Sequence, residues 1–219
     1  MNGDEKLLAK YVCDHSSAED EILHSLERKT NLCSVQPRMI SGQVQGKILE
    51  FMVDMLSPKR VAEIGTFTGY SAICMARALK GDAHLHTIDI NDELSYIAEE
   101  FIAAANLSDR ITMHIGSALD IVPQIGGVFD LVFIDGDKRE YPAYYNMLMD
   151  GGFVGKGSYM FADNTLWDGK VVDDSPKNLK DKYTQGILEF NSMVRADSRV
   201  EVVLMPFRDG MSIIKVIDG

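Results

Sequence analysis

Apolar residues recur at helical spacing over the first 56 residues of the chain. Leu7, Leu8, Tyr11 and Val12 follow this pattern, and so do the apolar residues of the segment 43–56. The pattern predicts helices within the first 35 residues and over residues 43–56. The acidic residues at 18–21 suit a helix start, and Ser57-Pro58 ends the later helix.

From residue 60 onward, short apolar runs alternate with helical patterns. Strands are predicted at 60–64, 84–88, 111–115, 129–134 and 158–162, and helices at 70–79, 94–105, 141–149 and 179–196. This alternation indicates βαβ units and a parallel sheet. Strands at 200–205 and 211–216 are joined by five residues, which is too short for a parallel crossover. The prediction is a Rossmann-like, doubly wound α/β fold, whose mostly parallel seven-stranded sheet ends in an antiparallel hairpin and carries helices on both faces.

Length and composition agree with one globular domain of this class. The chain has 219 residues, 46% hydrophobic and 25% charged, with no repeat and no Pro/Gly/Ser-rich linker. We therefore expect a single domain over residues 1–219, which begins with a helical region at 1–38.

The balance of charges narrows the classes of partner. Asp and Glu number 33 against 22 Lys and Arg, so the formal net charge is −11. Nucleic acids and anionic membranes attract basic surfaces, so neither is expected as a partner. A cationic partner, such as a metal ion or a positively charged cofactor, is compatible with this charge.

Cysteine usage and the chain start indicate a reducing setting. Cys13, Cys33 and Cys74 form no CxxC pair and are expected to be buried small hydrophobes. The sequence shows neither a secretory signal nor an apolar run long enough to span a bilayer. A cytoplasmic location is therefore expected.

Acidic residues lie at the ends of four predicted strands. They are Glu63, Asp89, Asp135 and Asp163. A carboxylate at one strand end ordinarily caps the next helix. In an open parallel sheet, however, ligands bind beyond the carboxyl ends of the strands, and four converging acids are costly as structure alone. We expect these acids to mark a binding site.

The first strand ends in a glycine turn, Glu63-Ile64-Gly65-Thr66-Phe67-Thr68-Gly69. Phe67 occupies the position where a dinucleotide pyrophosphate requires bare backbone, which disfavours NAD and FAD. Asp89 ends the next strand, where a carboxylate accepts the two ribose hydroxyls of a nucleoside. A ribose-binding acid without a phosphate grip favours S-adenosylmethionine (SAM), whose sulfonium is cationic.

Asp135, Asp163 and Asn164 are predicted to meet at two neighbouring strand ends, because adjacent strands lie about 4.8 Å apart. Two carboxylates and an amide oxygen suit Mg²⁺, Ca²⁺ or Mn²⁺ better than zinc. Lys138 follows Asp135 by three residues, so it is either an ordinary surface lysine or a group that reaches a substrate oxygen. The histidines lack metal-binding spacing, and His84 and His86 are interpreted as structural.

Together these segments resemble the cation-dependent O-methyltransferases of the caffeoyl-CoA O-methyltransferase type, with catechol O-methyltransferase as a more distant relative. The similarity covers Met39 to the C-terminus. It lies in the segments EIGTFTGYS, TIDIN, FIDGDKREYPAYY, ADNTLWDGKVV and MPFRDGMSI. The pair IDGDK and DNTLW is highly specific, whereas the glycine turn alone is not.

The resemblance implies a role for each matching residue. Asp135, Asp163 and Asn164 correspond to ligands of a divalent cation, and Lys138 corresponds to the general base. The cofactor-binding set corresponds to Met39, Ser41, Glu63, Gly65, Ser71, Asp89, Ala118, Asp135 and Tyr144, with Asp89 on the ribose.

The sequence departs from the plant enzymes at two places. Gly136 replaces an alanine that is common in them, a change expected to be harmless. The N-terminal region 1–38 shares few residues with them, although in this family it helps to build the acceptor site and the homodimer. A preference for coenzyme A esters therefore cannot be carried over.

The predicted function is divalent-metal-dependent methyl transfer from SAM to one hydroxyl of a catechol-like small molecule. Metal chelation by both hydroxyls lowers the pKa of the attacking one. Trp167 and Tyr144 are candidates for the acceptor-pocket wall, and the polar stretch 168–177 for a lid.

Four alternatives remain open at this stage. Three of them are a metal-independent small-molecule methyltransferase, a SAM-binding protein without catalysis and a NAD-dependent oxidoreductase. A nucleic-acid methyltransferase is disfavoured by the charge and by the lack of a base-flipping Asn/Asp-Pro-Pro-Tyr motif.

Overall fold

The computed structural model describes residues 3–175, 178 and 180–218. The chain divides into two compact units. The helical unit comprises residues up to Pro58, Thr66–His84 and Asn91–Thr112. The sheet unit comprises Lys59–Gly65, Leu85–Ile90 and the chain from Met113 onward.

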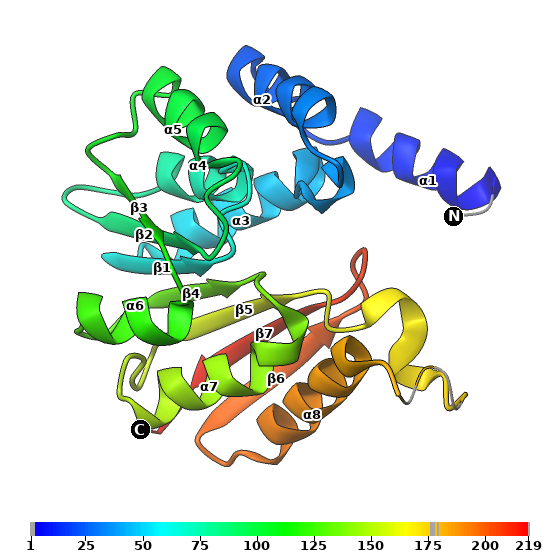
Figure 1. Ribbon diagram of the computed structural model, residues 1–219, viewed down its shortest axis with the longest axis vertical. Helices are drawn as coiled ribbons and strands as arrows, with labels where there is room; N and C mark the ends of the chain where they lie inside the picture. The colour runs from blue at the N-terminus through cyan, green and yellow to red at the C-terminus, as the bar shows by residue number, and fades with distance from the viewer. Residues whose placement is uncertain (1–2, 176–177, 179, 219) are drawn as a thin grey trace. The chain divides into compact units, whose positions relative to one another are not determined.

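Seven strands form one sheet in the order β3-β2-β1-β4-β5-β7-β6 (Figure 1). Their bounds are β1 Arg60–Ile64, β2 His84–Asp89, β3 Ile111–Ile115, β4 Leu131–Ile134, β5 Tyr159–Asp163, β6 Val200–Met205 and β7 Met211–Val216. β4 is parallel to both β1 and β5, whereas β7 is antiparallel to both β5 and β6. The predicted Rossmann-like sheet, mostly parallel and closed by an antiparallel hairpin, is confirmed.

The α-helices fall into two groups along the chain. The helical unit contains α1 Gly3–Asp14, α2 Glu21–Cys33, α3 Gly42–Leu56, α4 Tyr70–Arg77 and α5 Ser95–Ala104. The sheet unit contains α6 Ala118–Ile125, α7 Tyr141–Asp150 and α8 Lys182–Ala196. Short 3-10 helices lie at η1 Pro37–Met39, η2 Lys138–Glu140 and η3 Trp167–Val172.

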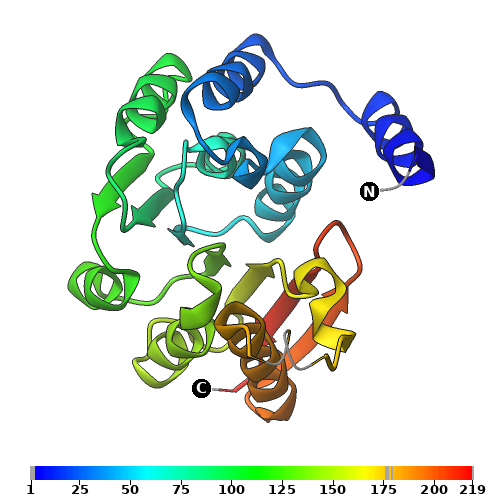
Figure 2. The same ribbon diagram turned by 45° about the vertical axis from the view of Figure 1, so that its right-hand side comes forward.

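Helices α7 and α8 lie side by side in the sheet unit (Figures 1 and 2). Their shared core is aromatic, because the ring of Phe190 meets the rings of Tyr141 and Tyr145 edge-on at centroid distances of 5.3 and 6.1 Å. All three side chains are almost completely buried. Burial of this much aromatic surface is a major source of stability for the sheet unit.

The helical unit is held together by close contact between α3 and α4. A Cβ at Gly46 would lie 2.7 Å from both Cys74 Sγ and Tyr70 Cε1, so only glycine lets the two helices approach this closely. The acidic start predicted near residue 20 is confirmed, because Asp20 caps α2 by accepting from the Leu23 amide at 2.9 Å.

Several expectations from the sequence were wrong. α6 was not predicted, because its helical pattern spans only eight residues and includes Pro123. β4 begins at Leu131 rather than 129, and the Phe129 amide before it donates to the carbonyl of Phe153, which lies outside the strands. α8 begins at Lys182, after its N-cap Asp181, and Leu179 lies outside the described residues. Of the three cysteines, only Cys74 is buried, and burial raises the pKa of its thiol to about 12.

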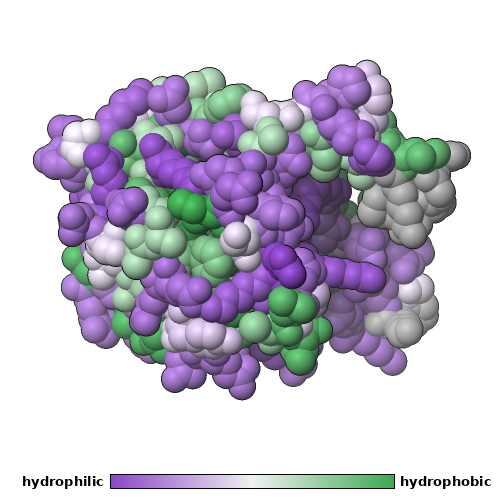
Figure 3. Space-filling model, turned by 90° about the horizontal axis from the view of Figure 1, so that it is seen from above, coloured by the Kyte–Doolittle hydropathy of each residue, from purple (hydrophilic) through white to green (hydrophobic). Residues whose placement is uncertain are grey.

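The face drawn in Figure 3 is largely hydrophilic, with separate hydrophobic patches between the polar side chains. Among the residues that the structure describes, no helix is long and apolar enough to cross a bilayer.

A charged network fastens the end of α8 to α7. Asp197, the C-cap residue of α8, accepts from the Tyr145 hydroxyl at 3.0 Å and from the Arg199 guanidinium at 2.7 Å. Arg199 also reaches Asp150 at 2.9 Å. The Arg199 guanidinium lowers the pKa of Asp197 to about 2. The native state therefore favours the ionised carboxylate.

This network predicts an acid-dependent loss of stability. Because the native pKa of Asp197 lies below its unfolded value, its contribution is complete above about pH 4 and is lost as the pH falls through 2. Asp197→Ala should lower the free energy of unfolding by about 1–3 kcal/mol at pH 7, since a buried donor loses its acceptor.

Thermal unfolding from pH 7 down to pH 2 checks this prediction, with Glu201→Ala as the exposed control. The difference in unfolding temperature between wild type and Asp197→Ala should become smaller toward pH 2. A difference that stays constant with pH would contradict a stabilising role for the ionised Asp197 carboxylate.

Candidate active site

The carboxyl ends of β1, β4 and β5 lie in register in the sheet unit. Ile64 pairs with Ile134, and Ile134 pairs with Ala162. Gly65, Asp135 and Asp163 each follow one of these paired residues, so they occupy corresponding positions at one edge of the sheet. The predicted convergence of acidic strand ends therefore holds for Asp135 and Asp163.

Gly65 permits the backbone of β1 to touch that of β4. A Cβ at this position would lie 2.4 Å from the carbonyl oxygen of Asp135, and its φ of +108° suits only glycine. Gly65 also donates its amide to the Ile88 carbonyl of β2 at 2.8 Å. Three strand ends thus meet at a point without any intervening side chain.

Lys138 forms an ion pair with Asp135. Its Nζ lies 2.7 Å from Asp135 Oδ1 and 3.1 Å from the Gly136 carbonyl oxygen, and it is 8% exposed. The ammonium also lies 5.1 Å from the centre of the Tyr141 ring. Lys138 is therefore not an ordinary surface lysine but a buried cation directed at the site.

The packing of η2 against α8 fixes this lysine. A Cβ at Gly186 of α8 would lie 2.3 Å from the Lys138 carbonyl oxygen and 3.0 Å from Arg139 Cα. The backbone of Lys138 therefore rests directly on the helix. At the start of η2, Asp137 accepts from the Arg139 amide and pairs with its guanidinium, which lowers the pKa of Asp137.

Asp163 ends β5, and Asn164 begins the turn that follows. Asp163 is 6% exposed, and its Oδ1 accepts from the Asn164 amide at 2.8 Å. Asn164 has a φ of 57°, in the left-handed region that Asn tolerates better than most residues. The backbone thus turns sharply at Asn164, directly after Asp163.

The hydroxyl of Tyr141 bridges the ends of β4 and β5. It lies 3.0 Å from the carbonyl oxygens of both Ile134 and Asp163. Burial, together with the charges of Asp135 and Asp163, raises the pKa of Tyr141 well above its usual value. Tyr141 therefore stays neutral near the carboxylates of Asp135 and Asp163.

The predicted cofactor residues Glu63 and Asp89 also lie in the sheet unit. Glu63 is completely buried within β1, and its Oε2 accepts from the Thr87 hydroxyl of β2 at 2.5 Å. Asp89 ends β2 as a half-buried residue. Its carbonyl accepts from the Gly116 amide at 2.8 Å, which ties the end of β2 to the residue that follows β3.

Ala118 and Tyr144 complete the predicted set within this unit. Ala118 is the buried first residue of α6. Tyr144 on α7 is buried, and its hydroxyl donates to Glu140 at 2.6 Å. Burial and the Glu140 carboxylate raise the pKa of Tyr144. A methyl group at Gly136 would lie 3.2 Å from the Tyr144 ring, so the glycine in this chain gives Tyr144 extra room.

The remaining predicted cofactor residues belong to the helical unit. Met39 lies in η1 and is 56% exposed. Ser41 precedes α3 and Ser71 lies in the first turn of α4, and both are buried.

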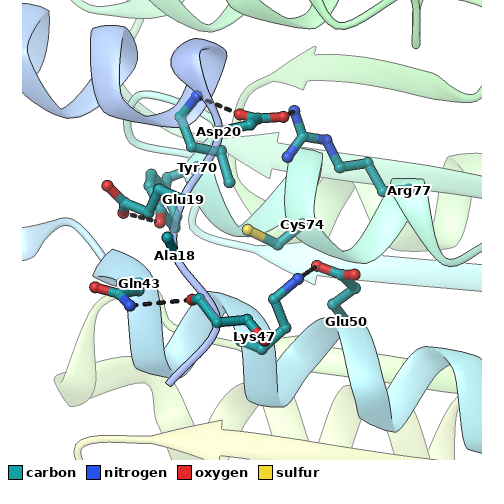
Figure 4. A pocket seen from close by; sticks show the side chains of 11 residues that line it. Ala18, Glu19, Asp20, Gln43, Lys47, Glu50, Tyr70, Cys74 and Arg77 are labelled. Carbon is teal, nitrogen blue, oxygen red and sulfur yellow. Dashed lines mark hydrogen bonds and ion pairs between the residues drawn. The ribbon is translucent and has the colours of Figure 1, made fainter. Parts of the chain in front are cut away.

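The helical unit also contains a polar cavity of about 190 Å³ (Figure 4). Its lining includes the ion pairs Arg77–Asp20 and Lys47–Glu50 and the hydrogen bond from Tyr70 to Glu19. None of the predicted site residues lines it. Its charged groups are already paired with one another, so the cavity is a separate feature.

The oxygen donors at the strand ends fit a divalent cation. Asp135 and Asp163 supply carboxylates and Asn164 an amide, which are ligands that Mg²⁺, Ca²⁺ and Mn²⁺ accept. At Asp135 the balancing positive charge is the Lys138 ammonium at 2.7 Å. The described part of the chain contains no cluster of three or more His, Cys, Asp or Glu that would hold a metal. The predicted set contains only two such residues, because its third member is an amide.

An aromatic wall stands beside Asn164. The Trp167 ring stacks on Tyr183 at 6.1 Å with an interplanar angle of 21°. Lys170 lies over Trp167 and Arg139 over Tyr183, at 5.1 and 4.9 Å from the ring centres. Flat aromatic surface of this kind suits an aromatic ligand.

Comparison with known proteins decides the family. The model of the O-methyltransferase family matches residues 13–217. The chain belongs to the O-methyltransferase family. A catechol O-methyltransferase from Niastella koreensis is 32% identical over 200 residues, which are 89% of this chain and 87% of that protein. Caffeoyl-CoA O-methyltransferase 1 from Eucalyptus globulus is 34% identical over 82% of this chain and 75% of its own length.

Solved structures of O-methyltransferases share the fold and hold the cofactor or its product. The O-methyltransferase from Bacillus cereus in complex with SAH is 28% identical, with a TM-score of 0.87 over 96% of this chain and 97% of that one. The O-methyltransferase TomG from Streptomyces achromogenes, in complex with SAM, is 29% identical, with a TM-score of 0.88 over the whole of both chains. This chain is therefore an O-methyltransferase with the same fold as these two proteins.

Two residues that support the candidate site were not predicted from the sequence, because their contacts lie far apart in the chain. Tyr141 bridges β4 and β5, and Gly186 supports Lys138 from α8. The only sequence signal for Tyr141 was its place beside Pro142 at a helix start. Gly186 gave none, because a glycine inside a helical pattern does not reveal what lies against it.

Proposed function

We propose that this O-methyltransferase transfers the methyl group of SAM to one hydroxyl of a vicinal dihydroxy aromatic compound, with a divalent cation at the strand ends. The observation that carries the proposal is the pairing of buried Lys138 with Asp135, beside Asp163 and Asn164. The relatives named catechol and caffeoyl-CoA O-methyltransferases support an aromatic diol as acceptor.

For the cation, we propose the ligands Asp135, Asp163 and Asn164. When bound, a divalent cation lowers the pKa of a hydroxyl that it coordinates. For SAM, we propose contacts with Met39, Ser41, Glu63, Gly65, Ser71, Asp89, Ala118, Asp135 and Tyr144. SAM supplies a methyl group that is already activated by its sulfonium.

The chain's own residues then orient the reactants and manage the proton. Lys138 Nζ donates to Asp135 Oδ1 at 2.7 Å. In this ammonium form it would stabilise the negative charge that develops on the attacking hydroxyl oxygen, and only as the neutral amine would it accept the hydroxyl proton. Trp167 and Tyr183 would hold the aromatic ring flat and exclude water. The structure forms a 3-10 helix over part of the proposed lid segment, at Trp167–Val172.

Catalysis should depend on the proposed cation. Methyl transfer to a catechol acceptor should require added Mg²⁺ or Mn²⁺ and stop in excess chelator. A monohydroxy analogue of the acceptor should not react. Asp163→Asn should lower the rate more than about 100-fold, because the site loses a charged ligand.

Product formation measured by liquid chromatography checks this prediction, with Asp82→Asn, an exposed turn residue, as the control. Full activity in chelator would favour the metal-independent methyltransferase. Calorimetric binding of SAM without any methyl transfer would favour a non-catalytic SAM-binding protein.

Turnover should also depend on Lys138. Lys138→Ala should lower kcat by about 10²- to 10⁴-fold, since general acid–base catalysis contributes about that much. The KM for SAM should stay within about twofold, because the change affects proton transfer rather than cofactor binding. Steady-state kinetics alongside Lys156→Ala, an exposed lysine, would test this, and an unchanged kcat would remove Lys138 from the mechanism.

We also propose that the enzyme is a homodimer, with residues 1–38 contributing to the contact. Leu7, Leu8 and Tyr11 of α1 are 69, 64 and 59% exposed, an unusual arrangement for three apolar side chains on one short helix. Analytical ultracentrifugation should give a species of twice the 24.3 kDa chain mass. The double change Leu8→Glu and Tyr11→Glu should shift it to the monomer, and a monomeric wild type would contradict the proposal.

A further inference from the structure

The turn that carries Asn164 and Trp167 is held by the tip of the β6–β7 hairpin. β5 ends at Asp163, which pairs with Met211, the first residue of β7. The hairpin tip at residues 206–210 therefore lies beyond the same end of the sheet as the proposed cation ligands. This placement brings a loop about 45 residues away in sequence against the site.

The backbone amides of the turn donate to the hairpin tip one after another. Thr165 donates to the Gly210 carbonyl at 3.1 Å, and Leu166 donates to the Asp209 carbonyl at 2.8 Å. The Trp167 amide lies 3.3 Å from the same Asp209 oxygen.

The next amide, that of Asp168, donates to the side chain of Asp209. Two residues of the hairpin thus accept from four consecutive amides of the turn, although the Trp167 amide also donates to the Asn164 carbonyl at 3.1 Å.

The conformation of the turn explains why such support is needed. Asn164, Trp167 and Asp168 all have positive φ, at 57, 48 and 55°. Non-glycine residues adopt this region at a cost and keep it only where surrounding contacts impose it. The hairpin tip supplies those contacts.

Gly210 brings the tip of the hairpin directly against the backbone of the turn. A Cβ at this residue would lie 2.5 Å from the Leu166 nitrogen, and its φ is +87°. Ser212 Oγ also donates to Thr165 Oγ1 at 3.1 Å, and Asn191 of α8 donates to the Thr165 carbonyl at 2.8 Å. Contacts from both the hairpin and α8 therefore hold the turn in place.

We propose that Asp209 is a positioning residue, which holds Asn164 as a cation ligand and Trp167 as the acceptor wall through its grip on the Asp168 amide. This inference deepens the proposed function and rests on it for the roles of Asn164 and Trp167. The Asp209 side chain accepts from the Asp168 amide and not from a proposed cation ligand, so it acts on the cation indirectly.

Trp167 provides a direct readout of the turn, because it is the only tryptophan in the sequence. Asp209→Ala removes the acceptor for the Asp168 amide, whereas Asp209→Asn keeps an oxygen at that position. Acrylamide quenching of Trp167 should increase in Asp209→Ala and remain close to wild type in Asp209→Asn and in the control Asp120→Ala.

The cation is tested on the same samples by titrating Mg²⁺ alone and following Trp167 fluorescence. The Mg²⁺ concentration at half-saturation should rise about tenfold or more in Asp209→Ala, the size typical of groups that support a metal ligand. Asp209→Asn should restore it to within about twofold. This rescue separates positioning from a general loss of structure.

Two results would overturn the inference. Equal quenching in wild type and Asp209→Ala would show that Asp209 does not hold the turn. Increased quenching with an unchanged Mg²⁺ half-saturation would show that the turn does not position a cation ligand. If wild type itself gave no response to Mg²⁺ and needed none for activity, the proposed function would fail, and quenching alone would still decide whether Asp209 holds the turn.

Discussion

Repulsion between Asp135 and Asp163 is the constraint on which the rest of this site depends. Parallel pairing of β4 and β5 places the two carboxylates at neighbouring strand ends, and both are largely buried. Like charges this close raise the free energy of the native state unless positive charge or hydrogen-bond donors compensate them. In this structure the Lys138 ammonium compensates Asp135, and the backbone N–H of Asn164 compensates Asp163. A divalent cation would complete this compensation.

Glycine determines how closely the supporting backbone can approach this charged pair. Gly65 lets β1 touch the Asp135 carbonyl, Gly186 lets α8 support Lys138, and Gly210 lets the hairpin reach the turn after β5. In each case a Cβ would lie within 2.5 Å of a backbone atom. The site is thus built largely from main-chain contacts, which fix geometry more firmly than long side chains do.

The sequence predicted most of the fold and the acidic strand ends, because both depend on local patterns. Apolar runs located the strands, and the short link between residues 205 and 211 required an antiparallel hairpin. Lys138 could be suspected from its spacing after Asp135, and the structure adds its burial and its partner. The sequence could not predict Tyr141 or Asp209 as supporting residues, since each acts across distances that no local pattern encodes. α6 escaped prediction because its eight residues include a proline.

The proposed divalent cation has Asp135, Asp163 and Asn164 as its ligands. Electron paramagnetic resonance of Mn²⁺ tests this assignment most directly, because the signal of free Mn²⁺ disappears when the ion is bound. Titration of the full chain should show one Mn²⁺ site per chain, which is lost in Asp163→Ala and retained in Asp82→Ala. A free Mn²⁺ signal that is the same with and without wild-type protein would contradict the account.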